Sequence, residues 1–198
     1  MKSVYILLFF IGISSIKVEK TFYEKLSDAA ISLTKDKVEY DPKYFSIKYP
    51  NGDVPKDKGV CTDVVIRAYR KLGIDLQKEV HEDMKANFSK YPKSWGLKKP
   101  DTNIDHRRVP NLQVYFTRFG QSLGATEKAS DYITGDLVTW KINGKLPHIG
   151  IVTNKKSADG KRNLIVHNVG AGQVLEDCLF KYDLTGHYRF QLDNAKIR

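Results

Sequence analysis

The sequence predicts an α+β domain in which helices pack on an antiparallel β-sheet. Apolar side chains recur at helical spacing in four segments before residue 120, and four strand-like runs follow between residues 135 and 190. Helices followed by consecutive strands are typical of this class, because strands that are neighbours in sequence usually pair with each other. The 198 residues, 41% of them hydrophobic, suffice for one domain with a full core.

The first half of the chain is predicted to be mainly helical. Residues 22–34 carry apolar groups at helical spacing, and residues 44–49 form a short strand or an extended arm before a turn-rich loop at 50–55. A second helix begins at Cys61 and ends near Gly73, a residue suited to a helix C-terminus. Two more helices are predicted at residues 76–87 and 111–119, and a polar stretch at 91–108 separates them.

The second half is predicted to form the sheet. Four runs rich in β-branched and aromatic residues are separated by turn residues, which is the pattern of consecutive strands. These runs cover residues 135–140, 147–153, 163–167 and 186–190.

The N-terminus reads as a secretory signal peptide. Lys2 precedes an apolar run from Val4 to Ile13, and small residues follow at Ser14 and Ser15. The run is shorter than the roughly 20 apolar residues of a spanning helix, although an uncleaved anchor is the alternative. We therefore expect a signal peptide at 1–15, a single domain at 16–198, a periplasmic or secreted location, and no stable membrane insertion after cleavage.

The formal net charge of +10 indicates an anionic partner. Nucleic acid is the first class to consider, but an exported protein meets little of it. Anionic cell-wall polymer or a membrane surface is the better partner for such a protein, and we predict no nucleic-acid binding. A solvated surface is the simpler interpretation, because the lysines are scattered along the chain.

Cys61 is the residue that indicates chemistry. A glycine turn at Gly59 leads to this cysteine, which opens the second helix. The free N–H groups and partial positive charge of a helix N-terminus favour thiolate over thiol, and thiolate is the nucleophilic form. The position therefore predicts a nucleophile, with its own backbone N–H available for an oxyanion.

Two histidines are predicted to act with this cysteine. A hairpin centred near Ser157 places His148 opposite His167 on one face, and the other face carries Ile149, Ile151, Leu164 and Val166. The two imidazoles then lie roughly 5 Å apart. A cysteine nucleophile needs a base and a group that orients the base, so His148 is the predicted base and His167 its partner.

Two other roles for these residues remain open. Two cysteines in an exported chain are compatible with a Cys61–Cys178 disulfide, which would remove the nucleophile. A zinc site built from Cys61, His148 and His167 is the second alternative. The chain lacks the short ligand spacings that are usual for zinc, and we therefore predict neither a metal nor a cofactor.

Several motifs carry a family resemblance. Gly135-Asp136-Leu137-Val138, then Pro147-His148-Ile149-Gly150-Ile151, then Val166-His167 follow a helix-start cysteine, as they do in NlpC-type cell-wall cysteine peptidases. Other stretches resemble a narrower bacterial family, known as domain of unknown function 1287. They are Gly59-Val60-Cys61-Thr62-Asp63-Val64-Val65, His81-Glu82-Asp83-Met84, residues 103–112 and residues 164–172.

The resemblance implies a papain-like α+β fold and a metal-free Cys-His-polar triad. It maps the nucleophile onto Cys61, the base onto His148 and the orienting residue onto His167. Relatives cut amide bonds in peptidoglycan stem peptides, so the resemblance implies that class of substrate. The chain departs from the NlpC-type pattern at the nucleophile, where Val60-Cys61-Thr62 replaces a step such as Asp-Cys-Ser.

Three more residues are candidates for substrate contact. Arg107 and Arg108 put two guanidiniums in a loop, and guanidinium binds the carboxylates that stem peptides carry. The alternative for this pair is a solvated loop with internal salt bridges. Gly170 follows His167 and would allow close approach of a substrate backbone, and its alternative is a simple turn.

The sequence thus predicts an exported cysteine amidase or peptidase that forms a thioester intermediate on peptidoglycan stem peptides. A papain-like acyl hydrolase or transferase with another substrate is the first alternative, because it would use the same triad. A non-enzymatic cell-wall-binding module, with Cys61 inert, is the second.

Overall fold

A computed structural model describes residues 19–192 of the chain. The predicted signal peptide at 1–15 lies outside the described residues. Within residues 19–192, no helix is both long and apolar enough to span a bilayer.

The four predicted helices are confirmed. Helix α1 is capped by Thr21, whose side chain and that of Glu24 bond reciprocally to backbone N–H groups. Helix α4 begins two residues earlier than predicted, because Pro110 fits a first helical turn, where no N–H partner is required. The helices are α1 (Phe22–Leu33), α2 (Cys61–Lys71), α3 (Leu76–Asn87) and α4 (Val109–Phe119), and the short 3₁₀ turn η2 (Asp105–Arg107) precedes α4.

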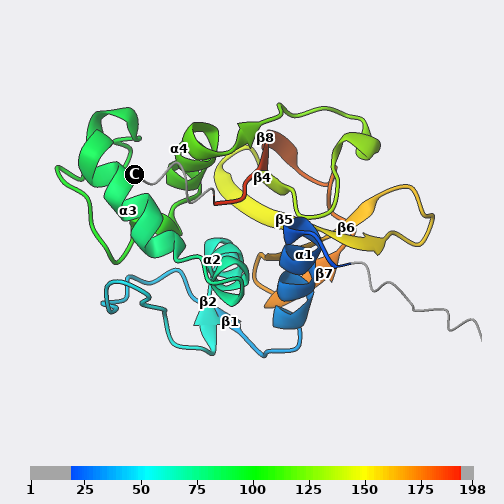
Figure 1. The fold of residues 1–198 in the computed structure, drawn as a ribbon, viewed down its shortest axis with the longest axis horizontal. Helices are drawn as coiled ribbons and strands as arrows, with labels where there is room; N and C mark the ends of the chain where they lie inside the picture. Colours follow the sequence, from blue (N-terminus) through cyan, green and yellow to red (C-terminus); the bar gives the residue numbers. More distant parts are fainter. Residues whose placement is uncertain (1–18, 193–198) are drawn as a thin grey trace, which may run out of the picture.

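The predicted sheet is also confirmed, and it has two further strands. Its six antiparallel strands run in the order β3-β8-β4-β5-β6-β7 (Figure 1). The predicted runs correspond to β4 (Leu137–Ile142), β5 (Leu146–Lys156), β6 (Asn163–Asn168) and β8 (Asp183–Arg189), and the additions are β3 (Gln121–Ser122) and β7 (Gln173–Glu176). Residues 44–49 form no strand and are an extended arm; instead β1 (Glu39–Tyr40) pairs in parallel with β2 (Lys58–Gly59).

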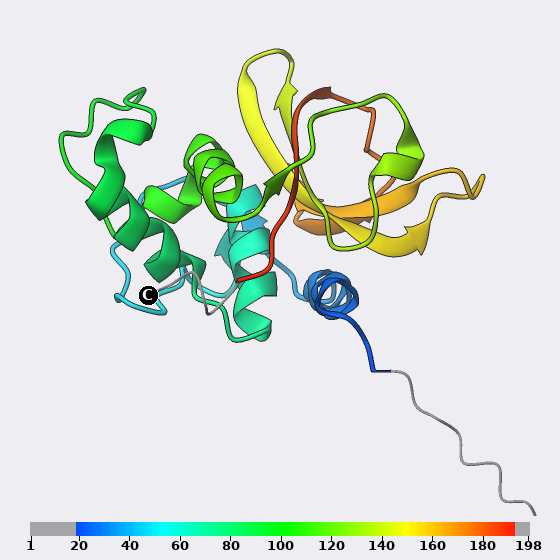
Figure 2. The same cartoon turned by 45° about the horizontal axis from the view of Figure 1, so that its top comes forward.

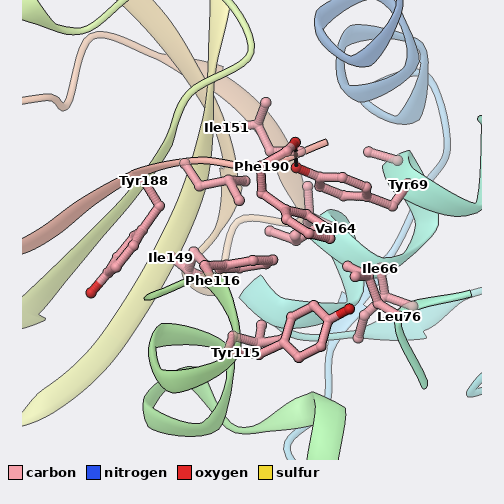
Figure 3. Close-up of a cluster of buried hydrophobic side chains, with 14 of the residues drawn as sticks. Val64, Ile66, Tyr69, Leu76, Tyr115, Phe116, Ile149, Ile151, Tyr188 and Phe190 are labelled. Carbon is pink, nitrogen blue, oxygen red and sulfur yellow. Dashed lines mark hydrogen bonds between the residues drawn. The ribbon is translucent and has the colours of Figure 1, made fainter. Parts of the chain in front are cut away.

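Helices cover one face of this sheet. In Figures 1 and 2, α1 and α2 lie against β5 and β6, while α3 and α4 extend to the side of the sheet. The contact is apolar: Ile149 and Ile151 of the sheet share a cluster with Val64 and Tyr69 of α2 (Figure 3). The buried Tyr69 hydroxyl donates to the carbonyl oxygen of Phe190 at 2.9 Å, so its polar end is satisfied.

The opposite face of the sheet is buried as well. Trp140 of β4 and Ile165 of β6 belong to a second apolar cluster, which the loop residues Tyr132, Cys178 and Leu179 complete. The Trp140 indole N–H donates to the carbonyl of Leu179 at 2.9 Å. His148 belongs to this face, because its ring lies 5.7 Å from the Trp140 ring.

The register between β5 and β6 differs from the predicted one by two residues. Ile151 pairs with Val166, where the prediction placed Leu164, because the turn is wider and an irregularity shifts the strands between Val152 and Lys156. A shift of two residues keeps every side chain on its face. His148 and His167 therefore still share a face, but they meet diagonally, with ring centroids 5.0 Å apart.

Candidate active site

The start of α2 is built to hold Cys61 in place. The Val60 N–H donates to Asp63 Oδ2 at 2.7 Å, which closes the first turn around the cysteine. Asp63 is itself paired with Arg107, and both side chains are almost completely buried. The backbone on either side of the thiol is therefore fixed by a charged network inside the protein.

The Cys61 thiol is buried, and its surroundings favour the neutral form. The pKa of the Cys61 thiol is raised to about 12, mainly by burial and further by the Asp63 carboxylate. The backbone N–H groups of Ile149, Thr62 and Cys61 itself donate to the sulfur and partly offset this increase. Only 5% of the residue is exposed. The expectation of a resting thiolate was therefore wrong, because desolvation outweighs the helix N-terminus.

Alkylation by iodoacetamide tests this state of the thiol. We expect the rate at Cys61 to rise by about tenfold per pH unit from pH 7 to beyond 9, because only the thiolate reacts and burial raises the pKa of this thiol to about 12. An ordinary thiol, with a pKa of about 8.5, would level off near that pH. Mass spectrometry of the Cys61 peptide from folded protein measures the rate and separates it from Cys178. A rate that levels off well below pH 8 would instead establish an activated thiolate.

The two histidines form a chain of hydrogen bonds with Glu176. His148 Nε2 lies 2.8 Å from His167 Nδ1, and His167 Nε2 lies 3.0 Å from Glu176 Oε2. Gly150 makes the arrangement possible, because a Cβ there would meet Ile165 at 2.6 Å and the His167 Cβ at 3.2 Å. Glu176 is absent from the sequence prediction because it lies on β7, a strand that was not foreseen.

The hydrogen bonds among His148, His167 and Glu176 determine which ring nitrogen carries each proton. Bonds from Lys181 and His167 lower the pKa of Glu176, so its carboxylate accepts and His167 Nε2 must donate. His167 Nδ1 then accepts from His148 Nε2, and His148 Nδ1 is left with a free lone pair. Burial and the neighbouring imidazole lower the pKa of His148 to about 3, so the ring is neutral at pH 7.

The structure brings the thiol to the strand that carries His148. The Cys61 sulfur accepts a hydrogen bond from the Ile149 N–H, so it lies against the peptide that joins His148 to Ile149. Helix α2 and the imidazole pair nevertheless belong to opposite faces of the sheet. Within residues 19–192, the sulfur forms no hydrogen bond with the His148 ring, and direct contact between them stays a prediction.

A pocket opens beside the thiol. Its volume is about 280 Å³ and its walls are mostly apolar. Arg108 is on the wall, with its guanidinium stacked 4.1 Å above the Trp95 ring, and no carboxylate lies within salt-bridge distance of it in the described part of the chain. The lining residues are Tyr40, Pro42, Val60, Cys61, Trp95, Ile104, Arg107, Arg108, Val109, Pro110, Leu146 and Pro147.

The other two predicted substrate contacts, Arg107 and Gly170, are held by contacts or backbone geometry within the protein. Arg107 also borders the pocket, but its guanidinium bonds both oxygens of Asp63, at 3.0 and 3.1 Å, and the Lys43 carbonyl at 3.0 Å. Its charge is therefore already used inside the protein. Gly170 lies in an exposed turn between β6 and β7, with φ of 115°, and is outside the residues that line the pocket. Only glycine adopts such a backbone readily, so the turn accounts for this residue, and its contact with substrate stays a prediction.

The predicted alternative of a disulfide is excluded. Cys61 and Cys178 are both free and both buried. Cys61 packs with the helices in the main core, whereas Cys178 belongs to the cluster on the other face of the sheet. A bond between them would have to pass through the sheet.

Fold and site together define an α+β protein with a helix-start thiol beside a buried His–His–Glu chain. The protein belongs to the family described as domain of unknown function (DUF1287), whose model matches its residues 27–190. It is 52% identical over 151 residues to the uncharacterized protein YijF of Escherichia coli strain K12, which covers 76% of this chain and 73% of that protein.

A solved structure also matches the chain. The structure of NlpC1 from Trichomonas vaginalis matches 89% of this chain, with 15% sequence identity and a TM-score of 0.48. The match covers 47% of that protein, so the chain spans about half its length.

Proposed function

We propose that this protein is a cysteine hydrolase that cleaves amide bonds in peptides, with Cys61 as nucleophile and His148 as base. The observation that carries the proposal is the ordered chain from Glu176 through His167 to His148, at a strand whose backbone bonds the Cys61 sulfur. A nucleophile, a base and a group that orients the base are the three parts that such a reaction needs.

The tautomers define the first step. His148 Nδ1 has the free lone pair, so it takes the Cys61 proton when the sulfur attacks the carbonyl carbon of the substrate. Since the resting thiol and imidazole are both neutral, proton transfer accompanies attack and does not precede it. The ring of His148 must turn toward the sulfur or move with substrate, because no hydrogen bond joins them at rest.

The later steps return the proton. The oxyanion of the tetrahedral intermediate accepts from the Cys61 N–H at the helix start, and the protonated His148 gives its proton to the leaving amine. A thioester on Cys61 remains. Water, deprotonated by His148, then attacks the thioester carbonyl and releases the carboxylic acid with the regenerated thiol.

The finer part of the proposal is the substrate class, carboxylate-bearing peptides of the peptidoglycan stem. The free Arg108 guanidinium on the pocket wall supports it, because guanidinium binds carboxylate with two parallel hydrogen bonds. The net charge of +10 fits an anionic wall polymer, and so does the exported location that the sequence predicts. Incubation with purified sacculi, and mass spectrometry of the released peptides, tests the substrate class and identifies the scissile bond.

Replacing Arg108 with glutamine tests the role of its charge. We expect kcat/KM for a carboxylate-bearing stem peptide to fall by about 10- to 100-fold, because a charged hydrogen bond contributes about 1.5–3 kcal/mol. The same peptide with its carboxylates amidated serves as the matched substrate. If R108Q lowers both rates equally, the guanidinium does not recognise carboxylate.

A second function is favoured by one observation, the neutral and buried state of Cys61. An inert thiol suits a module that binds cell-wall polymer without cutting it. Co-sedimentation with sacculi, together with the absence of released peptides, would select this function. A transferase on the same site would instead release an acylated amine rather than a free acid.

A further inference from the structure

A cluster of groups that could bind a metal lies at the Glu176 end of the hydrogen-bonded histidines. His167 of β6, Glu176 of β7 and Cys178 just after β7 offer a ring nitrogen, a carboxylate oxygen and a sulfur that all lie within 4.8 Å of one another. Glu176 and Cys178 are alternate residues, so an extended backbone directs their side chains to the same side. The proposed hydrolysis uses neither the sulfur of Cys178 nor a metal.

The donor set suits zinc. Nitrogen, oxygen and sulfur are the three donor types of protein zinc sites, and three protein ligands leave the fourth position to water. Ligand atoms around a tetrahedral zinc ion lie roughly 3.3–3.6 Å apart, so a pair at the 4.8 Å limit of this cluster would close by about 1.2–1.5 Å, shared between its two side chains. His167 and Cys178 are buried, while the Glu176 side chain is 34% exposed and provides both the entrance and the mobility.

We propose that Zn²⁺ binds His167, Glu176 and Cys178 and thereby switches off the base at His148. Zinc takes the lone pair of His167 Nε2, so the proton of that ring moves to Nδ1. His167 Nδ1 then donates to His148 Nε2, at the 2.8 Å contact, and the proton of the second ring moves to His148 Nδ1.

The proton count balances. Each imidazole carries one proton before and after, and only its position changes. Binding releases one further proton to solvent, that of the Cys178 thiol, because zinc binds the thiolate. His148 Nδ1, the atom that would accept the Cys61 proton, now carries a hydrogen. Lys181 opposes the site, since its ammonium lies 2.5 Å from Glu176 Oε1 and must swing away.

Cobalt(II), a spectroscopic substitute for zinc, tests the site directly. We expect the full-length mature protein to show the near-ultraviolet charge-transfer band of cobalt–thiolate bonding, and Zn²⁺ to displace it at one equivalent. Cys178→Ala removes the band and weakens zinc binding more than ~100-fold, above the usual effect of losing an outer-shell partner. Glu176→Gln, at a partly exposed position where misfolding is not expected, weakens binding too.

Cys61→Ala is the matched control, because it removes the other free thiol. The cobalt band must survive in this variant. A band that disappears with Cys61 and persists without Cys178 would overturn the proposal, since the metal would then sit at the nucleophile. Absence of any thiolate band in the wild-type protein would overturn it as well.

The inhibitory consequence rests on the proposed function, but the switch has a readout of its own. Long-range ¹⁵N–¹H spectra of histidine-labelled protein show which ring nitrogen is protonated. We expect protons on Nε2 of His148 and His167 without metal, and on Nδ1 of both rings with zinc. Unchanged tautomers on zinc loading would overturn the switch. Failure of the metal-free protein to hydrolyse any peptide would count against the hydrolase alone, because the cobalt spectrum is independent of turnover.

Discussion

Replacing Cys61 with alanine is expected to abolish peptide release from sacculi, and replacing His148 with alanine to lower kcat by roughly 10⁴-fold or more. Removal of one member of a nucleophile–base pair has effects of this order, because the members act as a unit. The Cys61 sulfur bonds the Ile149 N–H, one residue beyond His148, so the nucleophile contacts the strand that carries the base. Quantified muropeptide release by the purified mature variants measures the effect.

His187→Asn is the matched control for the histidine change. His187 is buried like His148, but it bonds Asp136 at 2.7 Å and stacks on Tyr132 at 4.3 Å, so its role is structural. We expect this variant to lose stability while its folded fraction keeps its kcat. Full activity of either Cys61→Ala or His148→Ala, with the fold intact by circular dichroism, would refute the mechanism.

Replacing Arg107 with alanine is expected to destabilise the protein by about 3–5 kcal/mol, the usual result of breaking a buried ion pair from one side. Asp63 would keep its charge with no partner in a place where only 3% of its side chain is exposed. The Lys43 carbonyl would lose its donor as well. The free energy of unfolding from denaturant titration measures the loss, with an unchanged m-value as the check on two-state behaviour.

Arg108→Ala provides the comparison at the adjacent position. Its guanidinium stacks on the Trp95 ring and forms no salt bridge within residues 19–192, so we expect a loss of about 1 kcal/mol or less. The two arginines thus separate stability from recognition: the first change lowers stability, the second lowers kcat/KM. An Arg107→Ala protein that is as stable as wild type but binds substrate poorly would restore the original prediction of a substrate contact at Arg107.

The sequence alone predicted the helices and the main strands, because their apolar spacing is a local property. It also placed Cys61 at a helix start and put His148 and His167 on one face, since alternation along a strand survives an error of two residues in register. The family was recognisable from the same residues, and the match over residues 27–190 confirms it.

Only the tertiary structure decided the state of the thiol and the reach of the histidine chain. The pKa of Cys61 depends on how much water the packed helices and sheet remove, which no local motif encodes. Glu176 of β7 bonds His167 of the neighbouring strand β6. Arg107 and Arg108 are adjacent in sequence, but the first pairs with the buried Asp63 and the second stacks on Trp95 at the pocket. Sequence thus determines which groups are available, whereas burial and pairing between distant segments determine which of them remain free to react.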